Sequence, residues 1–172
     1  MSKIRWLLAT LVVVLIGLVP TLASTSSASA DPGTILKFDV MTPVTGPYTG
    51  TSNPIRMVNG GGLPWIITSG TGSLKRDGRL QIHVRGLVLA FDSAVPANLR
   101  GTNPIPFFEG IVSCQSITDG MATITNVATG EFPASMSGNA DIRARVTLPQ
   151  PCVAPIVFVA SPTGAWFAAT GS

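Results

Sequence analysis

The chain has 172 residues, with 11 Lys and Arg against 8 Asp and Glu, which gives a formal net charge of +3 at pH 7. Charged residues make up 11% of the sequence, well below the usual share of about 25%. So small a basic excess gives no support to nucleic-acid binding. The surface must depend on uncharged polar residues, as is common in extracellular β proteins.

The first thirty residues have the pattern of a secretory signal peptide. Lys3 and Arg5 precede an apolar run from Trp6 to Val19, and Ala28-Ser29-Ala30 matches the small-residue site that signal peptidase cuts. The apolar run is shorter than the roughly 20 residues that a membrane-spanning helix needs. The sequence therefore predicts a signal helix over 1–30, cleaved after Ala30, with an uncleaved membrane anchor as the alternative.

The mature chain, residues 31–172, has a length that suits one domain with a single hydrophobic core. Two of the basic residues belong to the predicted signal peptide, so the mature chain is nearly neutral. We therefore predict one secreted domain with no nucleic-acid partner. It would contact a membrane only through the signal peptide before cleavage.

The mature chain reads as all-β. Short β-branched and aromatic runs recur between clusters of Gly, Pro and Asn, and we find no segment with convincing helical periodicity. The predicted strands are 35–40, 65–68, 72–75, 79–91 with a break near Gly86, 107–114, 121–127, 140–148, 153–160 and 165–170. The predicted loops are 43–53, 59–62, 96–106 and 133–138. Antiparallel strands with one wet face must pack in two layers, which predicts a β-sandwich, with a β-barrel as the alternative.

One hairpin has a register that can be predicted. Apolar and polar residues alternate from Leu80 to Arg85, so Leu80, Ile82 and Val84 should face the core. A two-residue turn would set Leu74 opposite a polar residue. A three-residue loop, Arg76-Asp77-Gly78, instead pairs Leu74 with Leu80 and places Gly78 where a left-handed conformation is favoured. We prefer the three-residue loop.

Two later strands differ in pattern. Residues 141–148 alternate, which predicts one wet face and an inward row of Ile142, Ala144, Val146 and Leu148. Residues 155–160 are apolar throughout, which indicates a strand covered on both sides or lying in an interface.

Cys114 and Cys152 are the two cysteines of the chain. Export would place them in an oxidising compartment, where we expect one structural disulfide, with free thiols or metal ligation as the alternatives. The closed loop is long, and chain-entropy estimates give such a bond about 3 to 4 kcal/mol. Alternation places Cys114 on the face of Phe108 and Val112. The bond would join one strand's end to another's start, and the two strands could belong to different sheets.

Catalytic candidates are few. His83, the one histidine, is predicted to face solvent in the middle of a strand. A secreted hydrolase would need two carboxylates across a cleft, for which Glu109 with Asp92 or Asp119 is the candidate pair. The alternative for Glu109 is a strand residue on the outer face, paired with an arginine. We predict no cofactor and no metal site, because one histidine and a bonded cysteine pair leave too few ligands.

Binding candidates are basic and aromatic. Arg143 and Arg145 share a polar strand face, and if that strand neighbours the one carrying His83 and Arg85, a cationic patch forms that could attract acidic wall polymers. A merely solvated face is the alternative. Exposed aromatic rings bind sugars by stacking, and the candidates are Tyr48, Trp65 and Trp166. Tyr48 lies in a loop and is the best exposed candidate, whereas core packing is the alternative for both tryptophans.

Several short segments together suggest a relationship. They are GGGLPW (60–65), GLVLA (86–90), GTNP (101–104), VSC (112–114), LPQPC (148–152), PIVFV (155–159) and WFAATG (166–171). With these segments the chain resembles small secreted proteins of unknown function from actinomycetes. The resemblance implies export and the cysteine pair, and it carries no activity with it.

The leading hypothesis is an exported, disulfide-stabilised β-sandwich that acts without catalysis as a structural or binding protein, with cell-wall polysaccharide as the candidate partner. The first alternative is a secreted hydrolase acting on wall material through Glu109. The second is an inhibitor of secreted proteases that presents the loop 96–106.

Overall fold

The computed structural model describes residues 33–170, and the predicted signal peptide with its cleavage site lies outside them. Within this range the chain forms strands β1 to β12 and one short 3-10 helix, η1 (Gly46–Tyr48). The all-β prediction is confirmed. Among residues 33–170, no helix is long and apolar enough to cross a membrane.

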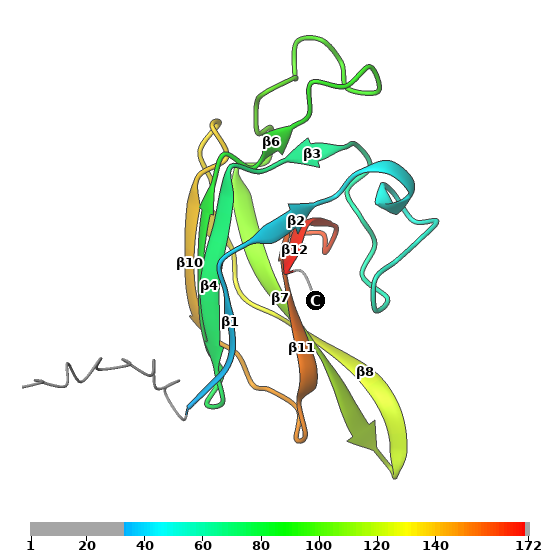
Figure 1. Ribbon diagram of the computed structural model, residues 1–172, viewed down its shortest axis with the longest axis vertical. Helices are drawn as coiled ribbons and strands as arrows, with labels where there is room; N and C mark the ends of the chain where they lie inside the picture. The colour runs from blue at the N-terminus through cyan, green and yellow to red at the C-terminus, as the bar shows by residue number, and fades with distance from the viewer. Residues whose placement is uncertain (1–32, 171–172) are drawn as a thin grey trace, which may run out of the picture.

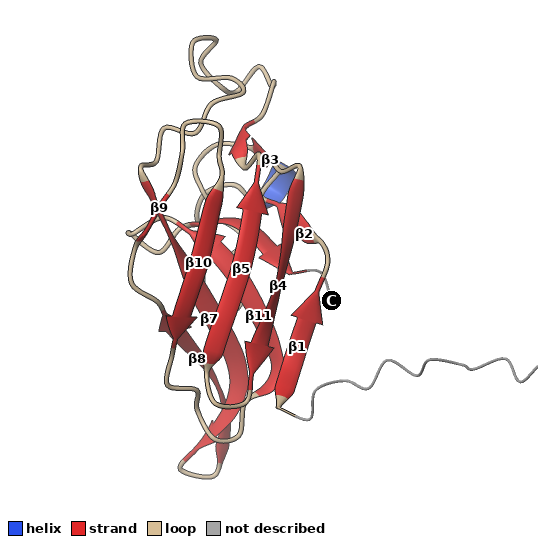
Figure 2. Cartoon of the chain, turned by 90° about the vertical axis from the view of Figure 1, so that its left-hand side faces the viewer, coloured by secondary structure: helices blue, strands red, loops and turns tan. Residues whose placement is uncertain are grey.

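Four strands form the first layer, here called sheet A (Figure 2). All neighbouring pairs in it are antiparallel. In spatial order its strands are β1 (Thr34–Phe38), β4 (Ser69–Lys75), β5 (Arg79–Arg85) and β10 (Ala140–Arg145).

The second layer, sheet B, faces sheet A across the core (Figure 1). In spatial order its strands are β2 (Met41–Pro43), β12 (Trp166–Thr170), β11 (Val153–Ala160), β7 (Phe107–Thr118) and β8 (Met121–Ala128). The short β9 (Phe132–Pro133) pairs with the start of β7, and β3 (Trp65–Ile66) and β6 (Val88–Leu89) form a separate two-stranded ribbon. The two sheets keep their own edges, which confirms the sandwich over the closed barrel.

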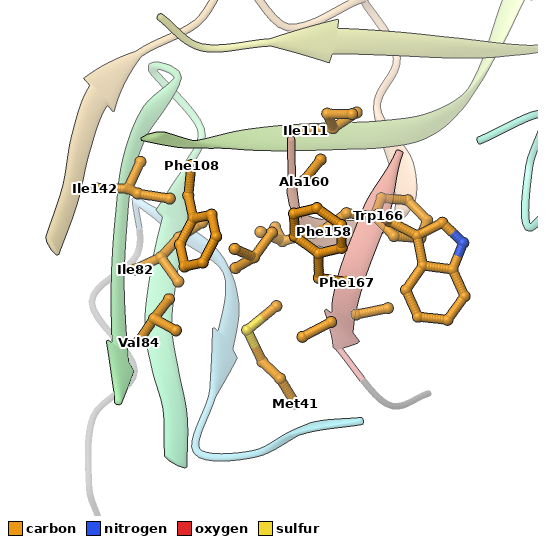
Figure 3. Close-up of a cluster of buried hydrophobic side chains, with 14 of the residues drawn as sticks. Met41, Ile82, Val84, Phe108, Ile111, Ile142, Phe158, Ala160, Trp166 and Phe167 are labelled. Atoms are coloured by element: carbon orange, nitrogen blue, oxygen red, sulfur yellow. The ribbon is translucent and has the colours of Figure 1, made fainter. Parts of the chain in front are cut away.

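Apolar side chains from alternate strand positions fill the space between the sheets. Figure 3 shows Ile82, Val84 and Ile142 of sheet A pointing towards Phe108 of sheet B, and all four are fully buried. Gly110 lets the sheets approach, because a side chain there would press on Leu80 and Ile82. Burying each of these large side chains stabilises the fold by about 1.5–3 kcal/mol.

The predicted β4–β5 register is confirmed, since Leu74 lies opposite Leu80. The Gly78 N–H donates to the Lys75 carbonyl at 2.9 Å and closes the loop. Gly78 has φ +83°, and any side chain there would also collide with the Val146 carbonyl. The position therefore requires glycine for both its conformation and its surroundings.

Several strand boundaries differ from the prediction. β7 runs on to Thr118 instead of ending at 114, because a two-residue turn at Asp119-Gly120 lets its polar end pair with β8. β10 stops at Arg145, where the Val146 N–H turns to the Gly78 carbonyl at 3.0 Å. The short strands β2 and β9 were not predicted, since each is brief and ends in proline.

The apolar run 155–160 belongs to β11, which lies between β12 and β7 in sheet B. Its last four residues, Val157–Ala160, are fully buried. The interpretation of a strand covered on both sides is confirmed for this half. The inward row of 141–148 is also buried apart from Ala144, which is half-buried.

The Cys114–Cys152 disulfide is confirmed. Cys114 lies within β7, and Cys152 precedes β11, whose Val153 pairs with Gln115. The bond therefore links neighbouring strands of sheet B, and the arrangement between sheets that the sequence left open does not occur. Alternation could show which face Cys114 occupies but not which strand lies beside it.

We expect the double variant Cys114→Ala with Cys152→Ala to lose about 3 kcal/mol of unfolding free energy, because the unfolded chain regains the entropy of a 38-residue separation. Urea unfolding followed by circular dichroism measures the loss. Wild type in reducing buffer is the control and should show the same loss. Equal midpoints for the variant and oxidised wild type would contradict the prediction.

Candidate functional site

Lysine and arginine gather on one side of the sandwich. Nine Lys and Arg occur in residues 33–170, and seven of them lie on sheet A or in its β4–β5 turn. These seven are Lys37, Lys75, Arg76, Arg79, Arg85, Arg143 and Arg145. Of the seven carboxylates in the same range, only Asp77 and Asp141 lie there. We call the outer surface of sheet A with this turn the basic face.

The strand registers set the order of groups on the basic face. One lateral row runs from Lys37 through Ser73 and Gln81 to Arg143. Arg145 lies opposite Arg79 in the next row towards the β4–β5 turn. Because Leu80, Ile82 and Val84 take the inward positions, the polar residues between them must face solvent.

Two carboxylates hold three arginines of the basic face in place. Asp141 accepts hydrogen bonds from Arg85 Nη2 at 3.0 Å and lies 2.7 Å from His83 Nδ1. Asp77 bridges Arg79 Nε at 2.8 Å and Arg145 Nη2 at 2.9 Å. The hydrogen bonds from His83 and then Arg85 hold the pKa of Asp141 below its usual value. The aspartates neutralise part of the face and leave it with a net positive charge.

Three cations on this face have no carboxylate partner within residues 33–170. Lys37, Arg76 and Arg143 are exposed, and no carboxylate of this range lies at ion-pair distance from them. Near the turn, Gly33, Lys75, Arg76, Asp77 and Arg79 line a hollow of about 340 Å³. The hollow is lined by three cationic side chains and one carboxylate, so its net charge favours an anionic group.

The structure therefore brings together His83, Arg85, Arg143 and Arg145, as the sequence suggested for neighbouring strands. It adds Lys37, Lys75 and Arg79 on the strands and Arg76 in the turn, none of which sequence reasoning assigned to the site. For the three strand residues, alternation indicated an outward direction, but only the pairing of β1, β4 and β5 places them beside the arginines of β10.

The aromatic candidates separate into two environments. Trp65 is 2% exposed and stacks on Phe167 with ring centroids 4.1 Å apart, so its faces are used in the core. Tyr48 is 47% exposed and lies at the rim of a cavity of about 330 Å³. Trp166 lines the same cavity, on the side of β12 away from sheet A (Figure 3).

The cavity beside Tyr48 combines apolar walls with uncommitted polar groups. Its lining residues are Thr42, Pro43, Thr45, Tyr48, Ile55, Ile156, Trp166, Ala169 and Thr170. Among the described residues, the hydroxyls of Thr42, Thr45 and Tyr48 make no hydrogen bond, whereas Thr170 Oγ1 accepts from the Val157 N–H at 3.1 Å. The indole N–H of Trp166 is buried without an acceptor. No charged residue lines this cavity, so its chemistry suits a neutral ligand.

The carboxylates of the hydrolase alternative, Glu109, Asp92 and Asp119, line none of the described cavities. Asp119 follows the end of β7, so ten residues of extended chain, about 30 Å, separate it from Glu109. Asp92 uses its carboxylate within its own turn, where Oδ1 accepts the Ala94 N–H at 2.8 Å. The Tyr48 cavity holds no carboxylate, and the hollow at the β4–β5 turn holds one.

Glu109 itself is 8% exposed, in the β7 row that faces away from sheet A. The outer-face prediction is correct, but in residues 33–170 no arginine pairs with it. Burial, and then the charge of Glu131, raise the pKa of Glu109. Ionisation of the Glu109 carboxyl therefore lowers the stability of the folded chain.

The segment between β6 and β7 projects beyond the sheets (Figure 1). It contains the loop 96–106 of the inhibitor alternative. Arg100 Nε donates to the Val95 carbonyl at 2.9 Å, and Val95 itself is buried. The Leu99 N–H donates to the Pro96 carbonyl at 2.9 Å. The segment is therefore ordered by its own hydrogen bonds, with residues 96–98 exposed at its tip.

Comparisons with known proteins give no relative from which a role could be transferred. No protein-family model, curated protein or solved structure matches the chain. The argument for a binding site therefore depends on the basic face and the Tyr48 cavity.

We expect Glu109→Gln to stabilise the protein at pH 7. The pKa of Glu109 in the folded chain lies above its ordinary value of 4.5. The free energy of unfolding therefore falls as the pH rises from the ordinary pKa to the raised pKa of the folded chain. Glutamine does not ionise, so the variant keeps this free energy at pH 7. Urea midpoints should be higher for the variant at pH 7 and should converge with wild type below about pH 4.

Asp119→Asn is the matched control, since it removes one negative charge from the exposed tip of the β7–β8 hairpin. Asp119→Asn should not show the pH-dependent gain in unfolding free energy that is expected of Glu109→Gln. If the urea midpoint of Glu109→Gln exceeds that of wild type by the same amount at pH 3 and at pH 7, the burial argument is contradicted.

Proposed function

We propose that the protein is an exported, non-catalytic binding protein that holds acidic polysaccharides of a cell wall or surface on its basic face. Of the nine Lys and Arg in residues 33–170, seven lie on sheet A or its β4–β5 turn, and this gathering carries the proposal. A nearly neutral chain that places its cations on one layer presents a local positive potential that its net charge does not reveal.

Export is part of the proposal. The signal-peptide pattern of residues 1–30 and the resemblance to small secreted actinomycete proteins support it. The Cys114–Cys152 disulfide is consistent with an extracellular protein, because such bonds persist in oxidising compartments.

An extended basic sheet surface suits a repetitive anionic polymer better than a small anion. Each exposed ion pair contributes only about 0.2–1 kcal/mol, so one contact gives little affinity. A polymer brings many carboxylates or phosphates to Lys37, Arg143 and the hollow at the turn at once. Several weak contacts on one chain then add up through effective concentration.

We expect Lys37→Glu with Arg143→Glu to weaken binding to an acidic polysaccharide about tenfold at low salt. Both residues are exposed and lack ion pairs in the described range, so the fold should remain intact. Retention on immobilised polygalacturonate, compared with neutral dextran, measures the effect. Wild-type retention should also fall as salt rises, because salt screens surface charges.

The matched control is Met57→Glu with Met136→Glu, which places two carboxylates on exposed positions outside sheet A. It should retain most of the binding. If wild type binds polygalacturonate no better than dextran, or if both double variants lose binding equally, the basic face is not the binding surface.

The Tyr48 cavity supports a second candidate contact, with a neutral sugar unit. Its volume lies at the lower end of ligand pockets, about 300–1,000 Å³, which suits a single ring. Tyr48 offers an aromatic face at the rim, and the free threonine hydroxyls can hydrogen-bond to sugar hydroxyls.

We expect Tyr48→Ala to weaken binding of soluble N-acetylglucosamine oligomers about fivefold, because the variant loses the stacking surface. Isothermal calorimetry measures it. Phe91→Ala is the control, since Phe91 is 76% exposed and does not line the cavity. Equal affinities for wild type and Tyr48→Ala would exclude the cavity as the sugar site and leave the basic face untouched.

A further inference from the structure

Strand β8 forms an outer edge of sheet B, with no strand beyond it in Figure 1. The sandwich has three other sheet edges, and each is protected. β1 is short and carries Lys37 with an irregular register, β10 carries Asp141, Arg143 and Arg145, and β2 has three residues ending in Pro43. Charges, proline, bulges and brevity are the features that keep sheet edges from pairing with other chains.

β8 has none of these protections. It is eight residues long, Met121–Ala128, with the sequence MATITNVA, and contains no charge and no proline. Its pairing with β7 is regular from Met121 to Ala128. A long, regular and uncharged edge is a template for another strand.

The turn fixes which backbone groups of β8 face outward. Thr118 and Met121 flank the two-residue turn and exchange hydrogen bonds with each other. Alternation then directs the N–H and C=O groups of Ala122, Ile124 and Asn126 away from β7. Among the backbone bonds of residues 33–170, none uses these outward groups.

We propose that the β8 edge pairs with the β8 edge of a second copy of this chain. Two antiparallel copies related by a two-fold axis at Ile124 would place Ile124 opposite itself and Ala122 opposite Asn126. Each outward N–H then meets an outward C=O, so the set of free groups is its own complement. An interface with two-fold symmetry requires this self-complementarity.

Side-chain chemistry supports the same occupant. In this register Met121, which is 70% exposed, lies opposite Val127 of the other copy, so its apolar surface is covered. Thr123 lies opposite Thr125, a pair that antiparallel strands favour. In this register no charged side chain lies opposite a like charge, because β8 carries no charge. Sheet B would continue through both copies, and each basic face would remain open.

The contact is narrow, so we expect a weak dimer. Edge pairing of eight residues covers less than the standard interface of about 1,600 Å². We expect a dissociation constant of about 10 µM to 1 mM for the dimer. The full mature chain, residues 31–172, should therefore shift from one to two chain masses as its concentration is raised across this range in sedimentation equilibrium.

Charge placed on the two-fold axis tests the register. Ile124→Lys alone and Ile124→Glu alone should each stay at one chain mass at about 1 mM, because like charges face each other. An equimolar mixture of the two variants should recover the double mass, because Lys then faces Glu. Recovery also shows that both variants are folded.

The matched control is Ile117→Lys, which adds the same charge to the same hairpin on β7, one strand away from the edge. It should dimerise like wild type. The proposal is overturned if wild type keeps one chain mass at about 1 mM, if the single Ile124 variants dimerise as wild type does, or if their mixture fails to recover the double mass.

Discussion

The other features of the structure depend on one interaction, the burial of the apolar inner faces of the two sheets against each other. Each sheet alone would expose a row such as Leu80, Ile82 and Val84, and only the opposing layer can cover it. The rows meet closely because Gly110 has no side chain at the point of contact. Once these positions are inside, strand alternation directs the residues between them to solvent. The basic face is thus the outer side of the same strands that build the core.

The disulfide adds to this core without organising it. Cys114 lies in β7 and Cys152 directly precedes β11, and these two strands already pair with each other in sheet B. The bond therefore acts chiefly by restricting the unfolded chain. This division would suit the proposed export, because the fold rests on packing and the covalent link lowers the population of unfolded chains exposed to proteases.

Local patterns predicted the features that depend on one or two strands. The Leu74–Leu80 pairing followed from alternation and a glycine, and the cysteine pair from composition. Features that depend on which strands are neighbours could not be predicted. Alternation gives the direction of Arg143 and Lys37 but not the sheet order that puts them in one row. Likewise, nothing in their local sequences indicates that Tyr48 and Trp166 line one cavity.

Charge segregation gives the molecule an electrical orientation. Sheet A is cationic, whereas the outer strand β8 and the Tyr48 cavity of sheet B carry no charged side chain. Near an anionic surface, the field would turn sheet A towards that surface before any contact forms. The molecule would then adsorb with one consistent side down. Sheet B would stay uppermost, available to whatever lies in the surrounding solution.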